Sequence, residues 1–458
     1  MSSTSADNRW LRSLPRTCVG LALAATCVGF VLYGRTSPHA KEAERQDQAE
    51  VFLNGIAERF VKLVLAVGEH DPLYVDAYYG PAEWRAEAVA AKKPLATIEA
   101  EAAALLAELP RRVITPPQES ARARRAFLMG QIESLLVRTR MLAGTHYTFA
   151  EETKGLYDVV VPPFDEKGIK AKLARIDSLQ PPGEGSLGDR LERFREDFIV
   201  PKDRVAAVFG AAVEEARRRT RRYIDLPRDE SFLIECVTGK SWSAYNWYKG
   251  QSQSVIQINT DLPIFIDAVL DLACHEGYPG HHVQSVRFEQ RLVRERGWIE
   301  FTVSPLFSPL TPIQEGSADF GVEVAFPGGE RVAFEREVLY PLAGLDPAKA
   351  ASYNRVMALV RGLGPARNEA PRRYLDKQIT ADEAVRFQRA YVLMTLERAR
   401  KATAFMDQYR SYVINYDVGY NLVKNFIEKR GGTADNPEKR WQEYAALISA
   451  PRLPSELK

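Results

Sequence analysis

Residues 273–284 read Ala-Cys-His-Glu-Gly-Tyr-Pro-Gly-His-His-Val-Gln, and they place His275, His281 and His282 close together in a chain with six histidines. A His-Glu pair on a helix opens a zinc-site pattern in which the first His binds the metal, the Glu is a general base and a second His follows one turn later. Here His275 and Glu276 form the pair, but the one-turn position is Pro279, which cannot bind a metal. The stretch therefore predicts a modified metal site on an interrupted helix.

A widened turn would allow a later histidine to become the second ligand. Because Pro279 lacks a backbone donor and Gly280 tolerates unusual dihedral angles, a wide turn over 277–280 can absorb two extra residues. In a straight helix His281 would point about 120° away from His275, whereas His282 would align with it but lie about 10 Å along the axis. The spacing leaves His281 and His282 both open, and a kinked core helix with incidental histidines is the alternative without a metal.

Residues 314–323 supply the carboxylates that such a site needs. Glu315, Asp319 and Glu323 follow one another at four-residue spacing on one helical face, among small and apolar residues rather than bases. These surroundings favour a buried role, with one carboxylate as a third ligand and another orienting a histidine.

Helical periodicity dominates the rest of the chain. Apolar residues at three- and four-residue spacing predict amphipathic helices over 49–67, 95–109, 120–142 and 204–224. Short β-branched runs at 232–234 and 254–258 predict strands, and helical signals resume at Pro263. The expected fold class is mostly α: a multi-helix domain with a small β-sheet, preceded by one N-terminal hydrophobic helix.

Composition excludes several classes of protein. The 62 Lys and Arg residues against 60 Asp and Glu give a net charge of +2, which lacks the basic excess of a nucleic-acid-binding protein. With 45% hydrophobic and 27% charged residues, the 458-residue chain is neither disordered nor a polytopic membrane protein. We expect no nucleic-acid partner.

The N-terminus predicts a route out of the cytoplasm. Residues 17–34 carry no charge and approach the length that spans about 30 Å of hydrocarbon. Arginines at 9, 12 and 16 precede the run and favour a cytoplasmic start. The expected domains are a cytoplasmic segment 1–16, a transmembrane signal anchor or signal peptide 17–34, and a helical metallohydrolase domain 41–458 with parts of about 41–228 and 229–458. That domain would lie in the periplasm, held by a single-pass anchor or secreted after signal cleavage.

The chain resembles a bacterial family known as domain of unknown function 885, a set of zinc-dependent hydrolases related to the gluzincin metallopeptidases. The likeness lies in Trp247-Tyr248 with the following 254–263, in 275–284, and in Glu315-Gly316, although Ser317 stands where the family has Trp. The resemblance implies a gluzincin-like fold in which His275, His281 and Glu315 bind Zn²⁺ and Glu276 is the general base. His282 and Asp319 are then a supporting residue or an alternative ligand.

The resemblance also implies how a substrate would bind. The stretch 254–259 is similar to an edge strand beside the cleft, where Val255, Gln257 and Asn259 would contact an extended peptide. Tyr416, in a segment similar to the family's Tyr-x-x-Gly, is a candidate catalytic residue that would stabilise an oxyanion. We therefore expect a metallopeptidase with peptide or peptide-like substrates. A membrane-anchored, non-catalytic interaction protein and a hydrolase of esters or envelope amides are the alternatives.

Overall fold

The computed structural model describes residues 38–111, 119–180, 182–240 and 242–458. The chain divides into two compact units, Met1–Arg45 and Gln46–Lys458, and the site discussed below belongs to the second. The expected cytoplasmic segment 1–16 and hydrophobic run 17–34 lie outside the described residues. Within the described residues, no helix is long and apolar enough to cross a membrane.

Helices form the first part of the fold, in agreement with the amphipathic patterns. Their bounds are α1 Pro38–Gly68, α2 Ala82–Ala91, α3 Leu95–Glu108, α4 Glu119–Leu142 and α5 Phe149–Tyr157. The predicted segments 49–67 and 120–142 lie in α1 and α4, and 95–109 coincides with α3 except for its last residue. Their apolar faces meet in one hydrophobic core in which Leu53, Ile98 and Leu135 have no exposed surface.

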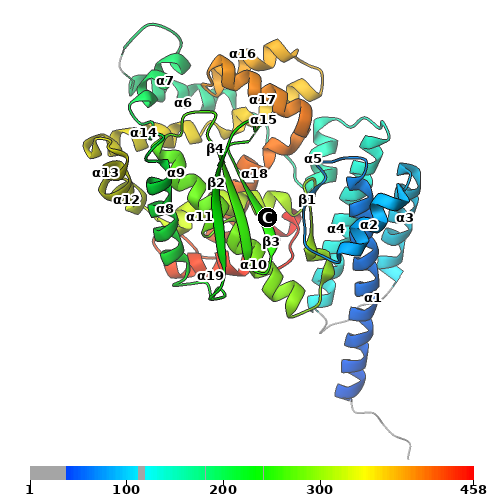
Figure 1. Cartoon of the computed structure of the whole chain (residues 1–458). Coiled ribbons are helices and arrows are strands. Elements are labelled where there is room, and N and C mark those ends of the chain that lie inside the picture. Colours follow the sequence, from blue (N-terminus) through cyan, green and yellow to red (C-terminus); the bar gives the residue numbers. More distant parts are fainter. Residues whose placement is uncertain (1–37, 112–118, 181, 241) are drawn as a thin grey trace, which may run out of the picture. The chain divides into compact units, whose positions relative to one another are not determined.

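A second hydrophobic core is built by helices from the remainder of the chain. Ten of the helices of this part are α6 Glu166–Ser178, α7 Leu187–Glu196, α8 Val205–Thr220, α12 Glu330–Phe334, α13 Tyr340–Ala343, α14 Ala350–Arg361, α15 Gly364–Leu375, α16 Ala381–Tyr391, α17 Leu396–Tyr409 and α19 Pro437–Leu447. The others are α9 Ile266–Leu272, α10 His281–Phe288, α11 Thr311–Ala325 and α18 Ile414–Lys429 (Figure 1). Val208, Val269 and Val283, from α8, α9 and α10, have no exposed surface in this core.

Two small sheets complete the fold. Strands β2 Ser231–Val237, β4 Gln253–Asn259 and β3 Ala244–Gly250 form one sheet in that order, with β2 parallel and β3 antiparallel to β4. Strand β1 Val75–Tyr78 pairs antiparallel with β5 Val303–Pro305, and β1 lies beside β3 (Figure 1). The expected mostly α fold with a small sheet is confirmed, and its strands at 232–234 and 254–258 lie in β2 and β4.

The order of the three-stranded sheet corrects one expectation. The stretch 254–259 is the middle strand, so both of its backbone edges are hydrogen-bonded to neighbouring strands. The strand with a free edge beside the motif residues is β3 instead. Strand β3 was not predicted, because its sequence, Ala-Tyr-Asn-Trp-Tyr-Lys-Gly, contains no β-branched residue.

Helices α11 and α18 cross at two glycines, and this crossing places the next residue, Glu315. A Cβ atom at Gly316 would lie 2.2 Å from both the carbonyl carbon and the carbonyl oxygen of Gly419. A Cβ at Gly419 would in turn lie 2.3 Å from the carbonyl oxygen of Pro312. The two backbones therefore approach more closely than any other residue would permit.

We expect Gly316→Ala to destabilise the protein, because its methyl group forces the two helices apart. Overpacking of this kind costs about 1–3 kcal/mol, measurable as a lower denaturant midpoint. Gly55→Ala is the matched control, since Gly55 is exposed on α1 and a Cβ there meets nothing within 4 Å. That variant should be as stable as the parent or gain up to about 1 kcal/mol. Equal stability of Gly316→Ala and the parent would show that the crossing can relax.

Candidate metal centre

The motif 273–284 forms two helical segments separated by a short break. A π-helical turn covers Ala273–Gly277, Tyr278 is extended, and α10 begins at His281. The Gly280 amide donates a hydrogen bond of 2.9 Å to the Cys274 carbonyl, which folds the break back over the π-helical turn. The predicted widened turn therefore lies over 273–277 rather than 277–280, and the next three residues are not helical.

Only glycine fits at position 280. A Cβ atom there would lie 1.9 Å from the carbonyl oxygen of His275 and 2.4 Å from that of Cys274. This close approach returns the chain to the start of the motif. As a result, His281 lies beside His275 although six residues separate them along the sequence.

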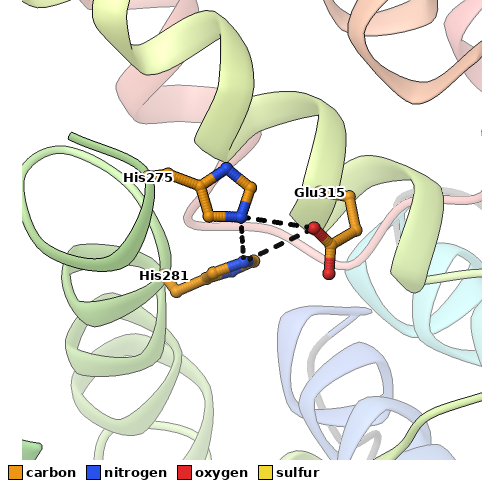
Figure 2. A group of neighbouring side chains, drawn as sticks. All are labelled: His275, His281 and Glu315. Atoms are coloured by element: carbon orange, nitrogen blue, oxygen red, sulfur yellow. Dashed lines mark hydrogen bonds and ion pairs between the residues drawn. The ribbon is translucent and has the colours of Figure 1, made fainter. Parts of the chain in front are cut away.

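Three side chains converge at this point, two from the motif and one from α11. Figure 2 shows His275, His281 and Glu315 directed toward one another. The two Nε2 atoms are 3.1 Å apart, and Glu315 Oε2 lies 3.3 Å from His275 Nε2 and 3.7 Å from His281 Nε2. Together they form a group that could hold a metal ion.

The spacing of these donor atoms matches a tetrahedral metal site. With metal–donor bonds of about 2.0–2.1 Å, two ligands at a tetrahedral angle lie about 3.3 Å apart. The three measured separations lie on either side of this value. In addition, Glu315 Oε2 is a buried oxygen that accepts no hydrogen bond, so it retains a lone pair for a cation. The donor set of two imidazoles and one carboxylate leaves a fourth position open.

Two further side chains hold the donors in place. Asp319 Oδ1 lies 2.8 Å from His275 Nδ1, which leaves the Nε2 atom of that ring to face the cluster. The hydroxyl of Tyr412 donates a hydrogen bond of 2.7 Å to Glu315 Oε1. Asp319 and Tyr412 each bond to the atom of the donor side chain that faces away from the cluster. They orient the donor and leave its metal-facing atom free.

The electrostatics of the cluster favour positive charge between the donors. Burial by itself lowers the pKa of His275, but Asp319 and Glu315 outweigh it and hold that pKa well above its usual value. Burial by itself raises the pKa of Glu315, but the two histidines hold it well below its usual range. Where no metal is bound, a proton on an imidazole thus supplies the positive charge that the carboxylates require.

His282 is held away from the cluster by its own hydrogen bonds. Its Nε2 lies 2.9 Å from Glu230 Oε2 and its Nδ1 lies 2.8 Å from Ser254 Oγ, so both ring nitrogens are occupied. Glu230 also accepts from the Tyr278 hydroxyl at 2.6 Å and from Arg221. Although burial raises the pKa of Glu230, these bonds lower it to about 2. Of the two histidines that spacing left open, the structure therefore directs His281 to the donor group.

Glu276 lies in the same cavity as the cluster but has no partner. The cavity has a volume of about 160 Å³ and is lined by His275, Glu276, His281 and Glu315 among others. Glu276 is 5% exposed, and only its backbone carbonyl, not its side chain, has a hydrogen-bond partner among the described residues. Burial raises its pKa above the usual value of a glutamate, which is the direction of shift found in general bases.

Strand β3, not β4, forms one wall of this cavity. Ala244, Tyr245, Asn246 and Tyr248 line it. The predicted substrate-binding residues Val255, Gln257 and Asn259 are not among its lining residues. They alternate along β4 with buried Ser254, Ile256 and Ile258 and therefore point to the other face of the sheet.

Tyrosines from the C-terminal helices close another side of the cavity. Tyr416 lines it, with its ring centre 6.5 Å from that of His275 and 37% of the residue exposed. Tyr412, which bonds to Glu315, was not predicted from the sequence, although it lies one helical turn before Tyr416. Nor was Asp76 predicted, a cavity-lining residue of β1 for which the sequence has no motif.

Comparisons with known proteins do not assign a family. No family model and no curated protein matches the chain. Among solved structures, the fold is similar to a protein described as a "putative lipoprotein" from Colwellia psychrerythraea, with 13% identity, a TM-score of 0.49 and coverage of 79% of this chain and 65% of the other. The chain thus spans less than two thirds of that protein's length.

Two further solved structures show a weaker similarity. A lipoprotein of unknown function from Shewanella oneidensis, also described as "putative", has 14% identity and a TM-score of 0.44 over 82% of this chain and 78% of that one. Metallocarboxypeptidase 1 of Trypanosoma cruzi has 13% identity and a TM-score of 0.42 over 89% and 90%. These values are too low to transfer an activity, so the functional argument rests on the site itself.

We expect Tyr412→Phe to weaken metal binding, because Glu315 loses the hydroxyl that orients it. Loss of such a supporting bond typically lowers metal affinity about 10- to 100-fold. A chelator competition titration measures the change. Tyr340→Phe is the control, since its hydroxyl is buried without a hydrogen-bond partner and lies outside the cavity lining. Equal affinity of Tyr412→Phe and the control would contradict a role for this hydrogen bond.

Proposed function

We propose that the protein is a zinc-dependent hydrolase that cleaves peptide bonds. The observation that carries this proposal is the position of Glu276, a buried carboxylate without a partner, in the same small cavity as three convergent metal donors. Two histidines with one carboxylate, an open fourth position and a nearby free carboxylate are the parts of a zinc hydrolase site. A purely structural cluster would not need the unpaired acid.

His275, His281 and Glu315 would hold the zinc ion. When bound, zinc lowers the pKa of water toward neutrality and polarises a carbonyl group. Glu276 accepts a proton from the attacking water and later delivers it to the leaving amine. Its burial and lack of a partner keep it available for both transfers.

The walls of the cavity supply the remaining roles. Tyr416 lines it with a partly exposed ring, and its hydroxyl donates a hydrogen bond to the oxygen that gains charge in the reaction. The free edge of β3 offers backbone donors and acceptors to an extended peptide, which would lie along it as a further strand. The Asn246 side chain donates a hydrogen bond of 2.6 Å to the Glu276 carbonyl and thereby fixes β3 against the motif.

The metal assignment is tested by native mass spectrometry of the full chain. We expect one zinc ion per chain, and loss of that ion in His281→Ala, because two donors bind zinc much more weakly than three. His282→Gln is the matched control: it alters the adjacent histidine, which faces Glu230, and should retain zinc. Zinc retained in His281→Ala but lost in His282→Gln would assign the second ligand to the other histidine.

The catalytic assignment is tested by Glu276→Gln. The amide keeps the shape of the side chain but cannot accept and return a proton, so the rate of peptide hydrolysis should fall at least about a hundredfold at unchanged zinc content. Metal analysis and a peptide panel measure the two quantities separately. A wild-type protein that binds zinc but cleaves no peptide would contradict the proposed activity.

A further inference from the structure

Asp76 is directed into the cavity by an irregularity in the smaller sheet. In the pairing of β1 with β5, Val75 lies opposite Pro305 and Ala77 opposite Ser304. Asp76 is therefore an extra residue, as in a β-bulge, where the chain bends and a side chain takes a new direction. Its side chain lines the same cavity as His281 and Glu276.

The cavity is acidic apart from its two histidines. Asp76, Glu276 and Glu315 line it, and none of the described lining residues is a lysine or an arginine. Glu315 is held by Tyr412 and the histidines, but the side chains of Asp76 and Glu276 make no hydrogen bond or ion pair with a described residue. Partly buried carboxylates without partners are costly unless a cation enters.

The roles proposed for Glu315 and Glu276 leave one carboxylate of the cavity unassigned. Asp76, Glu276 and Glu315 line the cavity, and a metal ion would be bound through Glu315. If Glu315 binds that ion and Glu276 serves as a base, Asp76 is the carboxylate left over. Burial, followed by the negative charge of Glu315, raises the pKa of Asp76 to about 7.

We propose that Asp76 binds an ammonium group of the substrate, so that the hydrolase prefers peptides that present a positive charge next to the bond it cleaves. This inference rests on the proposed function and names its substrate class. Such an ammonium group belongs either to the amino terminus of a peptide or to a lysine side chain. Tyrosines at positions 79, 245 and 248 also line the cavity, and aromatic rings favour organic cations over anions.

The test uses the full chain as Glu276→Gln with zinc, so that probes bind without being cleaved, and isothermal titration calorimetry. The neutral probe is acetyl-Ala-norleucine-Ala amide. Its two charged counterparts are acetyl-Ala-Lys-Ala amide, with a side-chain ammonium, and Ala-norleucine-Ala amide, with a terminal ammonium. We expect one charged probe to bind about tenfold or more tightly than the neutral one, as a hydrogen bond to a charged group would provide.

The variant Asp76→Asn in the same background should remove this preference by weakening the charged probe alone. Glu69→Gln is the control, because it removes the same charge from an exposed residue a short way along the chain and should leave the preference intact. Equal binding of charged and neutral probes, or a preference that survives Asp76→Asn, would overturn the inference. The comparison of probes in the unaltered Asp76 protein decides the question even if the variant folds poorly.

Hydrolysis of the same peptides by wild-type protein separates this inference from the proposed function. A charge preference in binding without any cleavage would leave the ammonium site standing and refute the hydrolase. Cleavage of charged and neutral peptides with equal efficiency would support the hydrolase and refute the ammonium site.

Discussion

The site depends on the contact of the Gly280 backbone with the carbonyl groups one turn before it. The 2.9 Å hydrogen bond to Cys274 and the absence of a Cβ atom let the chain reverse over the π-helical turn. Without this reversal, His281 would lie on a different helical face from His275. Two histidines six residues apart cannot share a site on a regular helix. Here the reversal brings their Nε2 atoms to 3.1 Å from each other. The glycine is therefore a requirement of the site and not only of the turn.

The third donor depends on a second close approach, which fixes α11 against α18. Because Gly316 contacts Gly419 directly, the adjacent Glu315 is held by the backbone itself rather than by a flexible side chain. The same approach brings the Tyr412 hydroxyl to within 2.7 Å of Glu315. Helix α19 contacts both the motif and α11. Its Tyr444 hydroxyl lies 3.1 Å from the carbonyl oxygen of Pro279 and 3.0 Å from that of Ser317. The donors are thus positioned by main-chain contacts before any ion binds.

Sequence reasoning succeeded where the signal is local and failed where it depends on distant segments. The pattern over 95–109 predicts α3, Leu95–Glu108, because amphipathic spacing lies within one element. Spacing could not choose between His281 and His282, since the choice depends on Glu230, which occupies the second of them from another part of the chain. Asp76 reaches the cavity only through pairing of β1 with β5, which are more than 200 residues apart and share no motif.

Two buried glutamates differ in whether the protein itself provides partners for their carboxylates. Glu230 is 1% exposed and accepts hydrogen bonds from Tyr278, His282 and two arginines, so the protein itself compensates its charge. Glu276 is nearly as buried, at 5%, but its side chain accepts no hydrogen bond from a described residue, and His275 and His281 offset only part of the effect of burial. A buried charge without a partner lowers stability, whereas a neutral side chain of similar size would not. A molecule that enters the cavity would supply the hydrogen-bond partner that Glu276 lacks, and a general base must be open to such a partner.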